Sequence, residues 1–197
     1  MPRAQGSVAE VLGDLSQALR ELRIAWYVFG AQALVLRGFP RATADLDVTV
    51  LLGATPTVRL VAALARQGFK PTFVDAAFLA TTRVLPVVHK ATGFPVDIVL
   101  GGPGLEELFA SAAEKVKVGR RLVPVATATH LVVMKVLAGR PKDIEDAAVL
   151  LAVRGRQIHA KELETLTKEL AAALAEDDIL VHLQEARRRA GRLRGRR

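Results

Sequence analysis

Asp45 and Asp47 lie one residue apart in a segment whose neighbouring residues are mostly apolar. Side chains alternate between the two faces of a strand, so Leu46, Val48 and Val50 point to one face and both aspartates point to the other. Two carboxylates on one face repel each other and are costly beside a hydrophobic layer, unless a divalent cation lies between them. The spacing therefore predicts a Mg²⁺ site.

A third carboxylate follows the same pattern in residues 95–100, where Val96 and Ile98 alternate with Asp97. If the two strands are neighbours, the three carboxylates converge on one or two Mg²⁺ ions, whose open positions would hold phosphates and water. Taken alone, Asp97 is better explained as an acid on an edge strand that faces solvent. Behind the pattern of Asp45 and Asp47, we favour the metal site.

Gly30 and Lys135 are candidates for phosphate contacts. Gly30 follows an apolar segment and precedes a helical one, so its backbone can approach a phosphate at a helix N-terminus, although packing explains most glycines at such turns. Lys135 lies in a segment that is apolar on nearly every side. Its ammonium either reaches the surface along its own stem, which is the default interpretation, or faces a cleft and contacts a triphosphate.

Asp143 and Asp146 are spaced to share one face of the following helix, where Lys142 can pair with Asp146. Solvated charge explains these two acids as well as a functional role does. The four histidines, in contrast, show no spacing typical of metal ligands, and we interpret them as structural or surface residues. They are His89, His130, His159 and His182.

Hydrophobic periodicity and turn residues predict the elements that position these side chains. A β-rich first part is followed by a helical second part, which indicates an α+β fold with a mixed sheet of four or five strands and a cleft between the parts. Strands are expected at residues 25–29, 44–51, 84–89, 95–100 and 122–125, and helices at residues 7–23, 30–38, 56–68, 105–112, 130–138, 141–153, 157–175 and 176–190.

The composition excludes several classes of protein. Hydrophobic residues make up 51% of the 197 residues, which is enough for a packed core. No run of apolar residues is long enough to span a membrane and the N-terminus lacks the layout of a signal peptide, so we expect a cytoplasmic protein without a membrane partner. The absence of cysteine excludes disulfides, thiolate catalysis and cysteine-ligated zinc.

The net charge of +8 is concentrated at the C-terminus. Seven arginines from Arg187 onward carry seven of these charges, so the preceding 186 residues are nearly neutral. This basic tail is either an arm that binds phosphates, because each neutralised phosphate releases counterions, or a solvated chain end.

Three separated motifs resemble those of the AbiEii-type nucleotidyltransferases, which belong to the superfamily of DNA polymerase beta and the minimal nucleotidyltransferases. The resemblance covers roughly residues 25–152. One difference is that the family often has Gly-Gly or Gly-Ser where this chain has Gly30-Ala31, so a hydroxyl contact to the terminal phosphate is missing. The motifs are Gly30-Ala31-x-Ala33-x-x-Leu36-x-Gly38-x-x-Arg41-x-Thr43-x-Asp45-x-Asp47, then Val96-Asp97-Ile98, then Met134-Lys135-x-Leu137-Ala138-Gly139-Arg140-x-Lys142-Asp143-x-x-Asp146.

The resemblance implies a nucleotidyltransferase-like mixed sheet with flanking helices at residues 1–125, a helical part at residues 126–186 that closes the cleft, and the basic tail at residues 187–197. It implies that Asp45, Asp47 and Asp97 are the catalytic residues and hold two Mg²⁺ ions during catalysis. The implied nucleotide-binding residues are Gly30, Ala31, Arg41, Thr43, Lys135, Asp143 and Asp146.

The sequence thus predicts an enzyme that moves an NMP from an NTP to an acceptor hydroxyl. Members of the family include toxins of toxin–antitoxin pairs that modify tRNA, so a tRNA or other RNA acceptor and a cognate antitoxin protein are the expected partners. Two alternatives stay open. One is an enzyme that modifies a small molecule such as an aminoglycoside, and the other is a catalytically inactive relative that binds nucleic acid or a protein partner.

Overall fold

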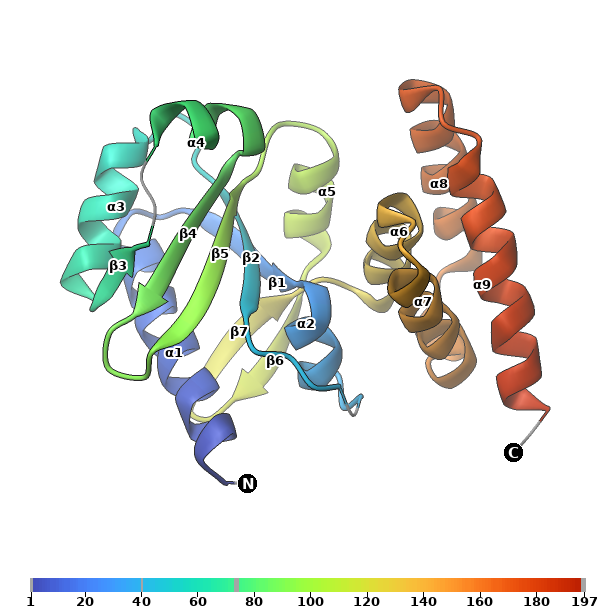
Figure 1. Ribbon diagram of the computed structural model, residues 1–197, viewed down its shortest axis with the longest axis horizontal. Coiled ribbons are helices and arrows are strands. Elements are labelled where there is room, and N and C mark those ends of the chain that lie inside the picture. The colour runs from blue at the N-terminus through green and yellow to red at the C-terminus, as the bar shows by residue number, and fades with distance from the viewer. Residues whose placement is uncertain (1, 40, 73–74, 196–197) are drawn as a thin grey trace. The chain divides into compact units, whose positions relative to one another are not determined.

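A computed structural model describes residues 2–39, 41–72 and 75–195 (Figure 1). The chain divides into two compact units, Met1–Ala126 and Thr127–Arg197. The first unit holds a β-sheet with helices, and the described part of the second unit is helical. The fold is therefore α+β, as predicted. No helix within the described residues is both long enough and apolar enough to span a membrane.

The sheet of the first unit contains seven strands within the described residues, in the spatial order β3-β4-β5-β2-β1-β7-β6. Both parallel and antiparallel neighbours occur: β2 pairs with β5 in parallel and with β1 in antiparallel orientation. The sheet is therefore mixed. Its strands are β1 (Ala25–Phe29), β2 (Leu46–Leu51), β3 (Phe69–Pro71), β4 (Val84–His89), β5 (Phe94–Leu100), β6 (Glu114–Val118) and β7 (Arg121–Val125).

Two strands of the sheet, β3 and β6, were not among the four or five that the sequence predicted, because their sequence signals are weak. Strand β3 is only three residues long and ends in Pro71. Strand β6 lies at the edge of the sheet and alternates valine with charged residues, so it presents no apolar run. Charged side chains on an edge strand discourage pairing with other chains.

Helices of the first unit cover the sheet with apolar side chains. Leu12, Leu15 and Leu19 of α1 are fully buried, and α1 contacts β5, β7 and α3. Helix α5 packs on β1 and β2, where Phe109 contacts the ring of Tyr27 edge-on. These helices are α1 (Pro2–Glu21), α2 (Gly30–Leu36), α3 (Thr57–Arg66), α4 (Ala76–Thr82) and α5 (Leu105–Ala112).

The second unit consists of α6 (Ala128–Ala138), α7 (Pro141–Val153), a 3₁₀ turn (Gly155–Gln157), α8 (Ala160–Leu174) and α9 (Asp178–Arg194). Thr127 caps α6, because its hydroxyl accepts a hydrogen bond from the backbone N–H of His130 at 3.1 Å. Pro141 occupies the first turn of α7, where its missing N–H costs nothing. The sequence predicted the start of α7 at residue 141, whereas α6 begins two residues before the predicted residue 130.

The basic segment differs from the separate tail expected at residues 187–197. Residues 187–194 continue α9, because Ala186 and Ala190 are buried and keep this stretch of helix packed on the unit. Arg196 and Arg197 lie outside the described residues. The arginines up to Arg194 therefore belong to a helix, which gives them fixed neighbours.

Candidate functional site

The carboxylates of Asp47 and Asp97 lie next to each other on one face of the sheet. The two residues are direct partners in the parallel pairing of β2 with β5. Partners in this register have side chains on the same face, on strands about 4.8 Å apart. Both aspartates are half-buried, whereas Leu46, Val48 and Ile98 are fully buried on the opposite face. The alternation that the sequence predicted is confirmed for Asp47 and Asp97, whereas Asp45 lies outside the strand because β2 begins at Leu46.

Strand β5 lies inside the sheet, between β4 and β2. The interpretation of Asp97 as an acid on an edge strand is therefore wrong. Its backbone is paired on both sides, with Pro86 on β4 and Asp47 on β2. An acid in the middle of a sheet has a defined neighbour, so Asp97 is a stronger candidate for a site than its local sequence alone indicates.

Gly30 brings the backbone against the Asp47 carboxylate. It connects β1 directly to α2 with φ +67°, a left-handed conformation that favours glycine. A Cβ atom at this position would lie only 1.9 Å from Oδ2 of Asp47. The site therefore needs glycine for two independent reasons, the positive φ and the close approach.

Gly30→Ala is expected to destabilise the protein by about 1–2 kcal/mol through backbone strain and to displace the Asp47 carboxylate. Gly53→Ala is the matched control, because Gly53 has φ +54° but no atom within 4 Å of the added Cβ. Urea denaturation of both variants separates the strain from the steric contact. Equal losses of stability would show that the approach to Asp47 does not matter.

Asp45 lies just before β2 and is exposed. The hydroxyl of Thr43 donates a hydrogen bond to Oδ1 of Asp45 at 2.7 Å, which fixes the carboxylate in the connecting segment. Arg41 belongs to the same segment and is half-buried. The structure thus brings Asp45, Asp47 and Asp97 to one end of β2, together with Thr43.

The electrostatics of Asp97 fit a site for positive charge. Burial raises the pKa of the Asp97 carboxyl above its ordinary value, and the negative charge of Asp45 raises it further. The ionised form is thus disfavoured where no positive charge is near. A bound cation would reverse this effect, so the three aspartates are suited to hold one.

Asp97→Asn is expected to leave the metal-free protein as stable as the wild type or slightly more stable at neutral pH, by less than about 1 kcal/mol because solvent screens the site. The folded state disfavours the ionised carboxylate of Asp97. The contribution of Asp97 to the stability of the wild type therefore falls as the pH rises from the ordinary Asp value through the raised pKa. The two proteins should converge at about pH 3. Urea denaturation with EDTA at both pH values tests this, and a clear loss of stability at neutral pH would contradict it.

The chemistry of the donor set fits Mg²⁺, which prefers carboxylate oxygens and keeps open positions for water and phosphate. Asp47 and Asp97 offer only oxygen donors on one face of the sheet, and Asp45 offers the same kind of donor just before β2. The ligand atoms of these three aspartates do not all lie within 4.8 Å of one another, whereas those of another group of described residues do.

That other group is formed by Glu10, Asp14 and His89, which the sequence did not reveal. His89 is buried, its Nε2 lies 3.1 Å from Oδ2 of Asp14, and its Nδ1 lies 2.9 Å from the Thr92 hydroxyl. The spacing of Glu10 and Asp14 along one helix face was a weak signal, and His89 follows 75 residues after Asp14. These contacts join α1 to the end of β4, as expected for a structural histidine.

The predicted residues of the second unit also come together. Lys135 is buried, and its Nζ lies 2.6 Å from Oδ1 of Asp143 and 3.0 Å from Oδ2 of Asp146. Arg140 forms a further salt bridge with Asp143. The interpretation that Lys135 reaches the surface is therefore wrong, and so is the interpretation of the two acids as solvated charge.

Opposing effects act on the carboxyl of Asp143. Burial by itself raises its pKa, but hydrogen bonds from Lys135 and Arg140 outweigh burial and hold the pKa below its ordinary value. Asp143 therefore stays ionised in the interior of its unit. The positive charges of Lys135 and Arg140 offset the negative charges of Asp143 and Asp146 in a network that connects α6 to α7.

No family model and no curated protein matches the chain. Among solved structures, the antibiotic-resistance factor ANT(2'')-Ia is similar with a TM-score of 0.60 at 13% identity, over 87% of this chain and 95% of that one. A crystal structure of ANT(2'')-Ia with adenylyl-2''-tobramycin gives a TM-score of 0.59 at 13% identity, over 85% and 99%. An antigenic nucleotidyltransferase-like protein from Paracoccidioides brasiliensis gives 0.55 at 16% identity, over 92% of each chain. The chain thus has a nucleotidyltransferase-like fold.

Proposed function

We propose that this protein is a Mg²⁺-dependent nucleotidyltransferase that transfers an NMP from an NTP to an acceptor hydroxyl. The observation that carries the proposal is the pairing of Asp47 with Asp97 on neighbouring strands, with the backbone of Gly30 against the Asp47 carboxylate. The nucleotidyltransferase-like fold supports it. So does the series of motifs that resembles the AbiEii-type enzymes.

In this proposal Asp45, Asp47 and Asp97 hold the metal. Bound there, Mg²⁺ would neutralise charge on the triphosphate and lower the pKa of the attacking hydroxyl. The acceptor oxygen forms a bond to the α-phosphorus, the bond between that phosphorus and the pyrophosphate oxygen breaks, and the hydroxyl proton passes to solvent. The protein mainly positions the groups and compensates their charge, as phosphoryl-type transfer requires.

Other proposed nucleotide contacts come from the turn at Gly30 and from the segment before β2. Gly30 and Ala31 open α2, and the first N–H groups of a helix have no partners within it, so they can donate to phosphate oxygens. Arg41 and Thr43 belong to the segment that leads to Asp45. The contact of Lys135 with phosphate stays a prediction, because its charge is balanced by two carboxylates in its own unit.

RNA is the acceptor that we favour, and tRNA is the first candidate. The support comes from the charge: seven of the eight excess positive charges lie at residues 187–197. A phosphate backbone is attracted to such a surface. The AbiEii-type resemblance also supports a role as the toxin of a toxin–antitoxin pair, with a cognate antitoxin protein as partner.

A small-molecule acceptor is the second candidate. The specific observation in its favour is the similarity to ANT(2'')-Ia, which was crystallised with adenylyl-2''-tobramycin. The third alternative, an inactive relative, is disfavoured because Asp45, Asp47 and Asp97 are all present. Asp47 and Asp97 also lie side by side on one face of the sheet.

Incubation of the protein with each α-labelled NTP and either total tRNA or tobramycin, with MgCl₂ or with EDTA, tests the proposal. We expect one NTP to label the RNA in the presence of Mg²⁺ and no labelling with EDTA. Labelled tobramycin would instead identify the second candidate. If no acceptor is labelled and isothermal calorimetry detects no binding of Mg²⁺–NTP, the enzymatic proposal is wrong.

A further inference from the structure

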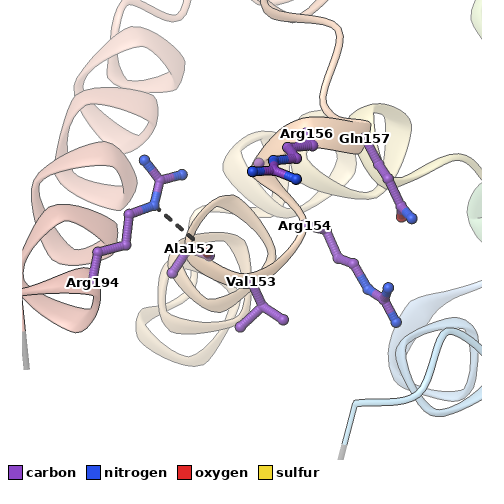
Figure 2. A pocket seen from close by; sticks show the side chains of 7 residues that line it. Ala152, Val153, Arg154, Arg156, Gln157 and Arg194 are labelled. Atoms are coloured by element: carbon purple, nitrogen blue, oxygen red, sulfur yellow. Dashed lines mark hydrogen bonds between the residues drawn. The ribbon is translucent and has the colours of Figure 1, made fainter. Parts of the chain in front are cut away.

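A pocket of about 660 Å³ in the second unit is lined by three arginines. It lies where α7 ends and the 3₁₀ turn begins, and Arg154 and Arg156 come from this segment (Figure 2). Arg194 reaches it from the last turn of α9. Two segments that are about 40 residues apart in sequence thus place positive charge around this pocket.

The position of Arg194 is fixed by the end of α7. Its guanidinium donates a hydrogen bond to the backbone carbonyl of Leu151. It donates another, 3.4 Å long, to the carbonyl of Ala152 (Figure 2). The last carbonyls of a helix have no partner within the helix, so a cation is favourable there. A guanidinium has five N–H donors in a planar fork, and these two contacts leave donors available.

Gly155 allows Arg194 to come this close. A Cβ atom at Gly155 would lie 2.6 Å from Nη2 of Arg194. The guanidinium therefore lies against bare backbone. An alanine at position 155 would displace it without changing the charge of the protein.

Three arginines of α9 have acidic neighbours. Arg187 pairs with Glu164 at 3.0 Å, and Arg188 and Arg189 both pair with Glu185. The acidic partners offset part of the charge in this group. None of these three arginines lines the pocket.

The pocket itself has no acidic residue among the described residues that line it. Arg156 is exposed and, within the described ranges, has no salt-bridge partner. No acid among the described residues therefore offsets the charge of Arg156 at the pocket. A charge without a partner at a concave site is suited to an anion.

We infer that this pocket binds the phosphodiester backbone of the RNA acceptor, with Arg156 and Arg194 as phosphate contacts. Guanidinium groups match phosphate oxygens in bidentate geometry, and contacts of this kind position a nucleic acid without selecting its sequence. The volume exceeds that of a single phosphate group, so a stretch of backbone fits better than an isolated ion. The inference rests on the proposed function, because it concerns the acceptor of that reaction.

Fluorescence anisotropy with a labelled tRNA transcript, in EDTA so that no transfer occurs, tests the inference at two salt concentrations. We expect Arg156→Gln to weaken RNA binding by about tenfold. The slope of log affinity against log salt concentration should fall by the amount that corresponds to about one phosphate contact. Arg188→Gln is the matched control, because it removes one charge from the group that pairs with Glu185. It should change the affinity by less than about twofold.

Gly155→Ala provides a test at constant charge. We expect it to weaken RNA binding by several-fold, because it displaces Arg194, while circular dichroism shows an unchanged helix content. Wild-type affinity in both Arg156→Gln and Gly155→Ala would overturn the inference. Equal losses in Arg156→Gln and Arg188→Gln would also overturn it, because they would indicate a diffuse charge effect.

The transfer assay separates this inference from the proposed function. If RNA binding depends on Arg156 but no NTP labels the RNA, the pocket assignment stands and the enzymatic proposal fails. If the RNA is labelled but both Arg156→Gln and Gly155→Ala bind it like the wild type, the enzymatic proposal stands and the pocket assignment is wrong.

Discussion

Asp47→Asn is expected to lower the rate of NMP transfer by at least about 100- to 1,000-fold, because it removes a negative charge that the proposed metal site needs. Asp47 is the central member of the three carboxylates, since it pairs in register with Asp97 and lies against Gly30. Asparagine has nearly the same shape, so the strand and the Gly30 turn should be preserved. Single-turnover transfer with the labelled NTP measures the loss, and circular dichroism verifies the fold.

Glu10→Gln is the control that separates the two acidic groups of the first unit. Glu10 is exposed and belongs to the group with Asp14 and His89, which is the more compact of the two. If the aspartates of β2 and β5 hold the catalytic cation, Glu10→Gln keeps wild-type turnover and wild-type stabilisation by Mg²⁺ in thermal denaturation. If Asp47→Asn retains both properties instead, the aspartates are not the metal site.

The core of this candidate site was predictable from sequence because strand geometry is local. Alternation of apolar and acidic residues placed Asp47 and Asp97 on the face opposite to Leu46, Val48 and Ile98, and the structure has this arrangement. The pairing of β2 with β5 was not predictable in the same way. It depends on contacts between segments about 50 residues apart, which no local pattern encodes.

The parts that the sequence did not reveal share a physical cause, since each depends on a partner distant in sequence. The edge strands β3 and β6 acquire their conformation by pairing with β4 and β7. His89 acquires its role from Asp14 on α1. Helix α9 continues through the basic segment because Ala186 and Ala190 pack on the rest of their unit.

The network around Lys135 shows how a motif residue can have a structural role that spacing alone does not predict. In a helix as apolar as α6, the expected options were a lysine that reaches the surface or one that faces a cleft. The structure instead has two buried carboxylates on α7 to neutralise it. A buried charge needs such partners, because its desolvation is costly. The network thus makes the packing of α6 on α7 depend on charge.

Lys135→Met is accordingly expected to lower the free energy of unfolding by about 3–5 kcal/mol, the usual effect of removing one member of a buried ion pair. Methionine retains the bulk of the stem, so the loss comes from the carboxylates of Asp143 and Asp146, which stay buried without the ammonium. Urea denaturation at neutral pH measures the loss. Lys142→Met is the control, because Lys142 is exposed one residue before Asp143, and it should change the stability by less than about 0.5 kcal/mol.

The dependence on pH follows from the lowered pKa of Asp143. A lowered pKa in the folded state contributes stability above the ordinary Asp value, and this contribution is lost as the pH falls through the folded pKa. Lys135→Met removes a main cause of the lowering, so its stability should decrease less steeply between about pH 5 and pH 2 than that of the wild type. The double variant Lys135→Met/Asp146→Leu removes both charges of one pair and should recover part of the loss. If Lys135→Met is as stable as Lys142→Met and shows the same pH profile as the wild type, the network does not stabilise the unit, and a contact of Lys135 with phosphate becomes the better explanation of this lysine.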